Sequence, residues 1–208
     1  MSETIFVIGD SVSLAYGPFL EKALAPEFGY ARKGGEREAL RDLDIPRGAN
    51  GGDSRMVRDY MEELERVGPF PYEVLLLNAG LHDIKRLGVE KQLQIPPADY
   101  RGNLEEIIRL GRRLGSRIFW VNTTPVEDEL HAARGVAFFR YQADVVAYQE
   151  IASGVMKKEG IPMAPLDQYT ASLGSGSQIF RDGVHFSETV AAKQGVFLAE
   201  WIYQRMRG

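Results

Sequence analysis

The sequence predicts an α/β protein: a three-layer α/β/α sandwich with a flavodoxin-like, five-stranded parallel sheet at its centre. Three observations support this prediction. Apolar runs of strand length alternate along the chain with longer segments of helical periodicity. The runs are apolar at successive positions, which indicates strands that are buried on both faces. Strands that alternate with helices pair in parallel and are joined by right-handed crossovers.

Five strands are expected. The first is "TIFVI" at 4–8, which ends at a glycine. The stretch 29–51 is the least regular and is rich in Gly, Arg and Glu, so it is expected to hold an edge strand and a surface excursion. Two further apolar runs follow, "VLLLN" at 74–78 and "RIFWVN" at 117–122, the second ending before Thr-Thr-Pro. A short strand is expected at 162–166.

Five helices are expected between and after the strands. Pro26 closes the first, Gly160 ends the fourth and Ser187 caps the fifth. The second is amphipathic, with apolar side chains at helical spacing. The expected ranges are 11–24, 57–67, 103–114, 136–158 and 187–206.

Length and composition are those of one globular domain covering residues 1–208. The chain has 44% hydrophobic and 26% charged residues, which is ordinary for such a domain. Its net charge of -4 gives no electrostatic reason to expect nucleic acid or an anionic membrane as a partner. The absence of cysteine excludes disulfides, thiolate catalysis and cysteine-ligated metal.

The start of the chain bears on localisation. Its apolar run covers only residues 5–8, which is too short for the apolar core of a signal peptide, and no basic residues precede it. No window of the sequence approaches the roughly 18 apolar residues of a membrane span. We therefore expect a cytoplasmic protein.

The predicted sheet directs attention to four loops. Ligands of such sheets bind beyond the carboxyl ends of the strands, which selects the loops 9–13, 49–54, 79–85 and 123–134. The first two loops both contain Gly-Asp-Ser, with the serines at Ser11 and Ser54. A serine hydroxyl is a poor nucleophile unless its surroundings activate it, and position alone does not decide between the two.

The local surroundings of the two serines differ. Ser11 follows a buried strand and opens a helix, near the positive end of the helix dipole, although an ordinary N-cap is the alternative role there. Ser54 follows the flexible stretch "GANGG", which suits backbone donors to an oxyanion better than a rigid nucleophile. Asp53 or Ser54 would then cap the next helix. A phosphate-binding loop is a weaker interpretation, because no Gly-Lys-Ser or Gly-Lys-Thr follows.

The stretch "FRDGVHFSE" supplies a candidate base. His185 follows Asp182 by three residues, so the two can share one turn. The carboxylate can then accept from one imidazole nitrogen and leave the other free, which is the base-and-orienter half of a catalytic triad. A solvated loop with a helix-capping aspartate is the alternative.

Four short motifs, taken together, resemble a known family. They are "GDS" with Ser11, "NGGDS" with Gly52, "GLHD" at 80–83 and "DGVH" at 182–185. Each motif alone is weak, but they occur in the order of the four sequence blocks of the SGNH hydrolases, also called GDSL esterases and lipases. Each also falls in an expected loop at the same sheet edge. By this resemblance, which spans nearly the whole chain, the protein is identified as a member of that superfamily.

The resemblance implies a serine esterase that hydrolyses a carboxylic ester through an acyl-enzyme. It implies Ser11 as the nucleophile, His185 as the base and Asp182 as its orienter, whereas Ser54 is not catalytic. The N–H groups of Ser11 and Gly52, with a side chain from the third block, would hold the oxyanion. It implies no metal or organic cofactor and a small-molecule ester as substrate. Because the loops offer no long apolar lid-like segment, we expect a short acyl group, such as acetyl on a carbohydrate.

The third block departs from the family pattern at His82, where the family has an asparagine. An imidazole can also donate an N–H, so the oxyanion role can survive the replacement. It would then depend on the tautomer and on pH, and Asp83 would favour the protonated ring if its carboxylate lies close. The alternative is that His82 only braces the loop.

Other residues have structural interpretations as well as functional ones. His131 would line a substrate pocket or, as the more ordinary outcome, lie in a solvated loop. The aromatic residues of the fourth expected helix are interpreted mostly as core rather than as a platform for sugar; they are Phe138, Phe139, Tyr141 and Tyr148.

Two other functions remain open from the sequence. A metal-dependent hydrolase would gather Asp10, His82, Asp83, Asp182 and His185 at one edge, although no recognised metal-binding spacing links them. A binding module without catalysis is the other, because the same fold can carry unrelated functions and the third block is altered.

Overall fold

The central sheet has five parallel strands. The structure, a computed structural model, describes residues 3–207. The sheet consists of β1 (Thr4–Ile8), β2 (Gly29–Arg32), β3 (Val74–Leu77), β6 (Arg117–Val121) and β8 (Met163–Ala164). They lie in the order β2-β1-β3-β6-β8, with every pair parallel. The predicted α/β class and flavodoxin-like strand order are therefore confirmed.

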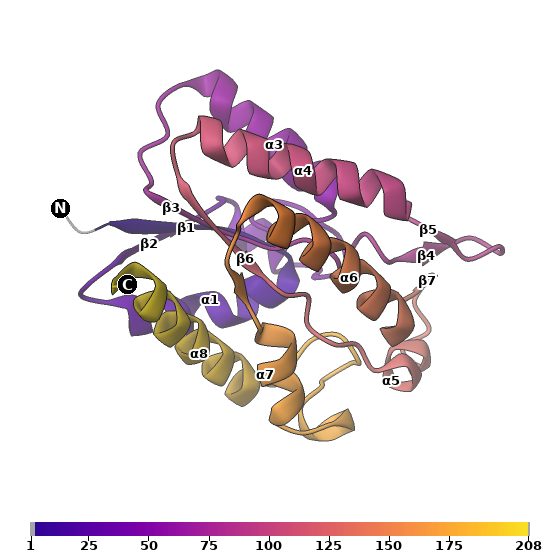
Figure 1. The fold of residues 1–208 in the computed structure, drawn as a ribbon. Helices are drawn as coiled ribbons and strands as arrows, with labels where there is room; N and C mark the ends of the chain where they lie inside the picture. Colours follow the sequence, from indigo (N-terminus) through magenta and orange to yellow (C-terminus); the bar gives the residue numbers. More distant parts are fainter. Residues whose placement is uncertain (1–2, 208) are drawn as a thin grey trace.

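Helices cover both faces of the sheet. One layer holds α3 (Ser54–Val67), α4 (Pro97–Arg113) and α6 (Gln142–Glu159), and the other holds α1 (Ser11–Leu24) and α8 (Glu188–Arg207), as Figure 1 shows. The short α7 (Leu166–Ser172) packs beside α8. Strands β1, β3 and β6 carry the apolar core between the layers, and all residues of β3 are buried.

The α1–α8 contact is close because of one glycine. A Cβ atom on Gly195 of α8 would lie 2.7 Å from the backbone nitrogen of Leu20 in α1 and 2.7 Å from Cβ of Phe19. The two helices can therefore approach closely only where this side chain is absent. This contact fixes the first helix of the chain, which begins at Ser11, against the last.

The predicted fourth helix, 136–158, is wrong at its start. Phe138–Phe139 instead form β7, which pairs antiparallel with β4 (Arg86–Leu87), and β4 also pairs with β5 (Gln92–Leu93). The helix α6 begins only at Gln142, whose N–H donates to Asp128 Oδ1 at 2.7 Å. Aromatic residues favour strands when a partner is present. The resulting small sheet projects from the body at the right of Figure 1.

The starts of two other helices also differ from the expected ones. Helix α3 begins three residues before its expected start because the Asp53 carboxylate caps it, accepting the Met56 N–H at 2.9 Å. Helix α4 begins six residues early, at Pro97, a residue that suits a first helical position. The expected edge strand and excursion are present as β2 and α2 (Glu36–Ala39). Helix α5 (Asp128–Ala133), α7 and a 3₁₀ turn, η1 (Gly176–Gln178), were not expected.

Within residues 3–207, no helix combines the length and the apolar character that crossing a membrane requires.

Candidate active site

Ser11 lies where β1 passes into α1. The strand ends at Ile8, and Asp10 caps the helix by accepting the Val12 N–H at 2.9 Å. Ser11 is therefore the first residue of α1, where backbone N–H groups lack partners within the helix. A Cβ on Gly9 would lie 2.8 Å from Cβ of Ser13, so the tight passage from strand to helix requires glycine. The result is a nearly buried hydroxyl held at a helix N-terminus.

His185 and Asp182 complete a row of hydrogen bonds with Ser11. The Ser11 Oγ and His185 Nε2 atoms are 2.9 Å apart, and His185 Nδ1 is 2.7 Å from Asp182 Oδ2. Asp182 Oδ1 also accepts the N–H groups of His185 and Val184, at 2.7 and 3.1 Å. Burial alone would raise the pKa of Asp182, but the hydrogen bonds from His185 hold it below its ordinary value. The carboxylate is thus charged and fixes the orientation of the ring.

The turn that holds this pair depends on Gly183. Its φ is +83°, and a Cβ there would lie 2.4 Å from the backbone nitrogen of His131. The Gly183 carbonyl accepts the Glu127 N–H at 2.8 Å, which fastens the turn to the segment after β6. Ser11 and His185, 174 positions apart in the chain, are brought together because α8, which follows the turn, packs on α1.

Gly52 lies in the second loop, with its N–H already engaged. It donates to Asn50 Oδ1 at 3.0 Å, and the same side chain donates from Nδ2 to the Leu43 carbonyl at 3.2 Å. The neighbouring Gly51 N–H donates to the Gly9 carbonyl at 2.8 Å, so this loop is fastened beside the Ser11 loop. An oxyanion that used the Gly52 N–H would have to displace the Asn50 oxygen.

His82 is completely buried, and within residues 3–207 neither of its ring nitrogens has a hydrogen-bond partner. Burial, with the positive charges of Lys85 and Arg140 nearby, places the pKa of His82 well below 6.5. The ring is therefore neutral at neutral pH and carries one N–H donor. A buried polar group without a partner needs an explanation such as an absent ligand or a catalytic role.

The condition under which Asp83 would favour a protonated His82 ring is not met, because neither ring nitrogen of His82 has a hydrogen-bond partner within residues 3–207. Both Asp83 carboxylate oxygens accept the Ser54 N–H instead, at 2.9 and 3.1 Å. Burial raises the pKa of Asp83 to about 8, so this carboxyl is not a permanent negative charge beside the imidazole.

The second Gly-Asp-Ser copy has a structural role. Ser54 is fully buried, and its Oγ accepts from Asn103 Nδ2 at 3.0 Å. Asp53 caps α3, as expected, and its Oδ2 also accepts from Gln94 Nε2 at 2.7 Å. Of the two serines, Ser11 is the one that forms a hydrogen bond with His185.

His131 is not in a solvated loop. It lies buried in α5, with Nε2 3.4 Å from an Nη1 atom of Arg140. Burial and the charges of Arg140 and Arg134 lower the pKa of His131 to about 4. The expected aromatic core is likewise reduced to Tyr148, because Phe138, Phe139 and Tyr141 are only partly buried.

The residues considered for a metal site do not form one. Within residues 3–207, no three His, Asp or Glu side chains are placed to hold a metal ion. Asp10 is committed to the α1 N-terminus and Asp83 to Ser54.

A largely apolar cleft of about 420 Å³ opens at Ser11. Its walls come from α1, from the segment before α3 and from the start of α8; the main side chains are Leu14, Pro18, Phe19, Leu40, Leu43 and Phe186. The residues Arg181 and Glu188 add charge to the lining. Sequence reasoning missed this cleft, because Leu40 and Leu43 lie in the irregular stretch where no periodicity marks an inward face.

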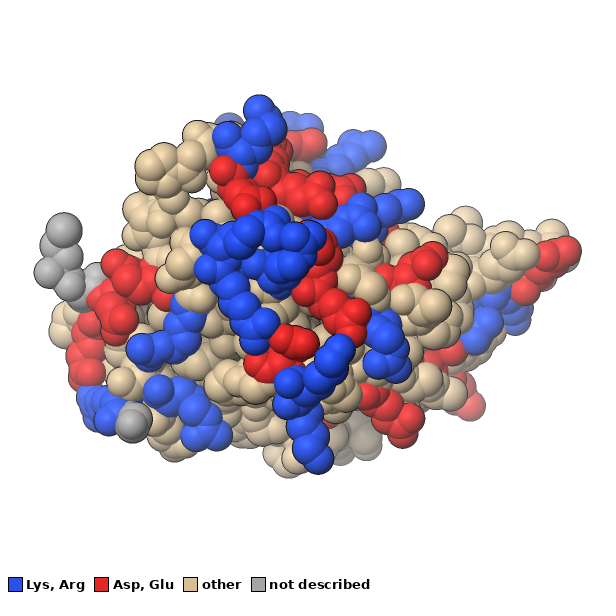
Figure 2. Space-filling view, turned by 45° about the horizontal axis from the view of Figure 1, so that its top comes forward, with Lys and Arg blue, Asp and Glu red and all other residues tan. Residues whose placement is uncertain are grey.

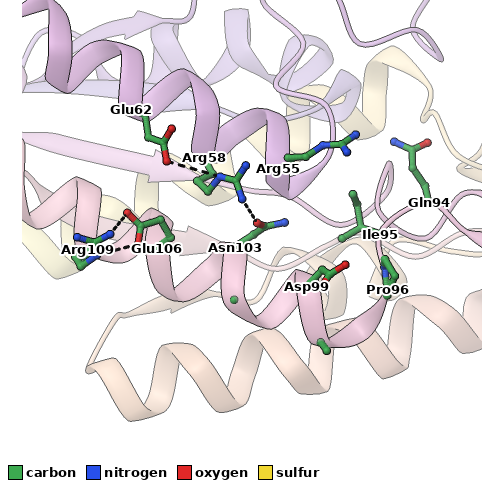
Figure 3. A pocket seen from close by; sticks show the side chains of 12 residues that line it. Arg55, Arg58, Glu62, Gln94, Ile95, Pro96, Asp99, Asn103, Glu106 and Arg109 are labelled. Carbon is green, nitrogen blue, oxygen red and sulfur yellow. Dashed lines mark hydrogen bonds and ion pairs between the residues drawn. The ribbon is translucent and has the colours of Figure 1, made fainter.

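A larger, polar groove of about 590 Å³ lies elsewhere, between α3 and α4 (Figure 3). Two of its arginines bond to other side chains of the groove: Arg58 donates to Asn103 at 2.8 Å and Arg109 to Glu106 at 2.8 Å. Figure 2 shows that positive and negative side chains are interspersed over this face. The groove includes neither Ser11 nor His185, so it is separate from the candidate site.

Comparison with known proteins gives a match in structure alone. No protein-family model matches the chain, and no curated protein matches it. A lipase/acylhydrolase from Enterococcus faecalis superposes with a TM-score of 0.67 at 16% identity, covering 98% of this chain and 96% of that one. A member of the lipolytic G-D-S-L family from Veillonella parvula gives 0.66 at 11% identity, covering 98% and 100%. Est24, a carbohydrate acetylesterase from Sinorhizobium meliloti, gives 0.62 at 11% identity, covering 98% and 99%. The chain therefore has the fold of the SGNH, or GDSL, hydrolases.

Proposed function

We propose that the protein is a carboxylic ester hydrolase that acts through an acyl-enzyme on Ser11. The observation that carries the proposal is the hydrogen-bonded row Ser11–His185–Asp182, with its links of 2.9 and 2.7 Å. A serine next to an oriented imidazole is the arrangement that activates a hydroxyl for attack on a carbonyl. The hydrolase fold supports the same chemistry.

The reaction follows from this geometry. His185 Nε2 takes the Ser11 proton as Oγ attacks the ester carbonyl, and Asp182 stabilises the imidazolium that forms. The tetrahedral intermediate collapses, the carbon–oxygen bond to the alcohol breaks, and His185 returns the proton to that alcohol. Water then attacks the acyl-serine with the same base, which releases the acid and restores the Ser11 hydroxyl.

Three donors are proposed for the oxyanion. The Ser11 N–H stands at the start of α1, where the helix dipole favours negative charge. The neutral His82 ring contributes an N–H that has no other partner within residues 3–207. The Gly52 N–H joins them when it exchanges Asn50 Oδ1 for the substrate oxygen. Donors aimed at developing charge in a water-poor site supply a large share of such catalysis.

The cleft at Ser11 supports an apolar acyl group longer than acetyl. Its largely apolar walls would bury a chain of several methylenes, each worth about 0.8 kcal/mol when removed from water. An acetyl group would leave most of that surface in water. The sequence led us to expect acetyl, as in the carbohydrate acetylesterase of the same fold, and the chain-length test below decides between the two.

The test combines labelling with a series of p-nitrophenyl esters. We expect a fluorophosphonate to label the wild-type chain once and to label Ser54→Ala once, but not to label Ser11→Ala. Turnover should fall by at least roughly 10³-fold in Ser11→Ala. Across acetate, butyrate and octanoate, kcat/KM should rise with chain length, whereas a steady fall from acetate would favour the acetylesterase. Hydrolysis by folded Ser11→Ala at the wild-type rate would reject the proposal, and inhibition by a chelator would favour a metal-dependent hydrolase.

A further inference from the structure

One carboxylate fastens the segment that forms a wall of the cleft. We call residues 33–52, between β2 and the Asp53 cap of α3, the cover loop. Within it, the Asp44 side chain is only 11% exposed and forms ion pairs with Arg134 and with Arg140, the latter at 3.2 Å. The Asp44 carbonyl also accepts from Lys85 Nζ at 2.5 Å. Three cations from three separate segments thus converge on one residue of the cover loop.

Arg134 links Asp44 to Asp182, because it contacts both carboxylates. The same Nη2 atom that pairs with Asp44 lies 3.8 Å from Asp182 Oδ2, the oxygen that accepts from His185 Nδ1. Asp44 therefore shares a single guanidinium with the carboxylate that orients the candidate base. With Asp44 neutral, Arg134 would be drawn toward Asp182 and would compete with His185 for that oxygen.

Arg140 links Asp44 to the loop that contains His82, because it contacts both Asp44 and Leu81. Its side chain is 1% exposed, and its Nε atom donates to the Leu81 carbonyl at 2.7 Å, one residue before His82. Asp44 is its carboxylate partner. A buried guanidinium that loses its counter-charge is costly, so removing the Asp44 charge would drive Arg140 to move. The Leu81 carbonyl, and with it the position of His82, would move as well.

The cover loop itself connects Asp44 to the cleft and to Gly52. The preceding residue, Leu43, lines the cleft at Ser11, and its carbonyl accepts from the Asn50 side chain that holds the Gly52 N–H. Burial alone would raise the pKa of Asp44, but Arg134 and Arg140 hold it below its ordinary value, so the carboxylate is charged at neutral pH.

We propose that Asp44 is a positioning residue that holds the cleft wall, the His82 loop and the Asp182 carboxylate in one catalytic arrangement, through Leu43, Arg140 and Arg134 respectively. The proposal rests on the function proposed above, because it assigns Asp44 a role in that ester hydrolysis. Asp44 does not touch the substrate's reacting atoms. It acts through groups that do, or through groups that orient them.

The kinetic test compares Asp44→Asn with Glu38→Gln, an exposed carboxylate of the same cover loop whose loss changes the net charge equally. We expect Asp44→Asn to lower kcat by roughly 10²-fold, as small displacements of catalytic groups do. The KM for p-nitrophenyl octanoate should rise more than the KM for the acetate, because the cleft wall is released. Asp44→Glu should recover part of kcat, and Glu38→Gln should remain within about twofold of wild type.

A second variant separates the link from Asp44 to Asp182 from the link between Asp44 and the cleft wall. Arg134 contacts Asp182, and its loss leaves Asp44 held by Arg140 and Lys85, so Arg134→Gln should lower kcat for both esters and change the ratio of their KM values less than Asp44→Asn does. It is also informative if Asp44→Asn does not fold, because the Arg134 side chain is partly exposed. A folded Asp44→Asn with wild-type kcat and KM for both esters would overturn the proposal. So would a lowered Tm with unchanged kinetics, because it would show only a structural brace.

An activity-free measurement distinguishes failure of this proposal from failure of the proposed function. Amide hydrogen exchange should accelerate in the cover loop and in residues 79–85 in Asp44→Asn but not in Glu38→Gln. Equal hydrolysis by wild type and Ser11→Ala would reject the esterase while leaving this measurement able to decide whether Asp44 fastens both loops. Unchanged exchange in Asp44→Asn would overturn the fastening itself.

Discussion

His82 has a buried imidazole whose two nitrogens have no hydrogen-bond partner among residues 3–207, and such a group costs about 1–3 kcal/mol when it stays unpaired. Its surroundings make the cost larger for the charged ring than for the neutral one, since burial and the nearby cations Lys85 and Arg140 oppose protonation. The neutral ring keeps one N–H for an incoming negative oxygen. An unpaired donor of this kind is compatible with stabilising charge that exists only during the reaction.

We expect His82→Ala to lower kcat for p-nitrophenyl esters by roughly 10²–10³-fold with a smaller change in KM, because a donor to the oxyanion is lost. His82→Asn should retain much more activity, because an amide also donates an N–H. Because the pKa of His82 lies well below 6.5, the kcat of wild type should not change near neutral pH through this ring. Steady-state kinetics of both variants provide the measurement, and full activity in His82→Ala would exclude the donor role.

At the scale of single residues, contacts between residues close together in the sequence could be predicted, whereas contacts between residues far apart in the sequence could not. Asp182 and His185 lie three residues apart, so their contact follows from a single turn. The cap of α3 was expected at Asp53 or Ser54 and is Asp53, whereas the cap considered for α1 was Ser11 and the structure has Asp10. By contrast, the ion pair of Asp44 with Arg134 joins positions 90 apart and depends on where three loops meet, which no spacing in the sequence records.

At the scale of elements, the α1–α8 contact carries the geometry of the site. Ser11 begins α1 and His185 lies three residues before α8, so the distance between them is set by how these helices pack. The bounds of α1 were predicted because Gly9, which ends the preceding strand, and Pro26 mark them locally. The start of α6 was not, because the strand that replaces its first turn pairs Arg86 with Phe139, a contact between distant segments.

Gly195→Ala should destabilise the protein by about 1–3 kcal/mol, because the new Cβ would lie 2.7 Å from the backbone of α1. This corresponds to a Tm lower by roughly 2–12 °C at this chain length. Gly154→Ala in α6 is the matched control: its position is open, so the same change should leave stability equal or raise it by up to about 1 kcal/mol. Thermal unfolding followed by circular dichroism measures both, and equal Tm values for the two variants would contradict the close-contact argument.

At the scale of the whole molecule, buried titratable groups link stability to pH. Asp83 is fully buried between two loops of the candidate site, and burial raises its pKa to about 8, above the roughly 3.9 of an unfolded chain. Between these values, the folded state keeps a proton that the unfolded state releases. The contribution of Asp83 to the free energy of unfolding is therefore most favourable below pH 4 and is lost as pH rises through about 8.

Asp83→Asn removes this dependence while leaving an oxygen to accept the Ser54 N–H. We expect the variant and the wild type to have similar Tm values at pH 5, and the variant to become the more stable of the two at pH 9. Comparing the two proteins cancels the contributions of other groups, such as His131, whose lowered pKa acts in the opposite direction. A Tm difference that does not change between pH 5 and pH 9 would show that Asp83 titrates normally.

The predicted strand order of the sheet was correct because each central strand is apolar at successive positions and is followed by a helical segment. The small β4-β5-β7 sheet was missed, since strands of two residues carry no periodicity. The four motifs predicted that Ser11, Gly52, His82 and His185 lie at one edge of the sheet; in the structure Ser11 begins α1, and the other three lie outside helices and strands. The motifs could not show that Asn50 occupies the Gly52 N–H, because this depends on one side-chain rotamer.

The separation of Ser11 and His185 along the chain has a consequence during synthesis. At roughly 5–20 residues added per second, about 10–35 s elapse between the translation of one residue and the other, 174 positions later. Throughout that interval the growing polypeptide on the ribosome carries a serine without its imidazole. A nascent chain, or a product of premature termination before position 185, therefore lacks the Ser11–His185 pair on which the proposed hydrolysis depends.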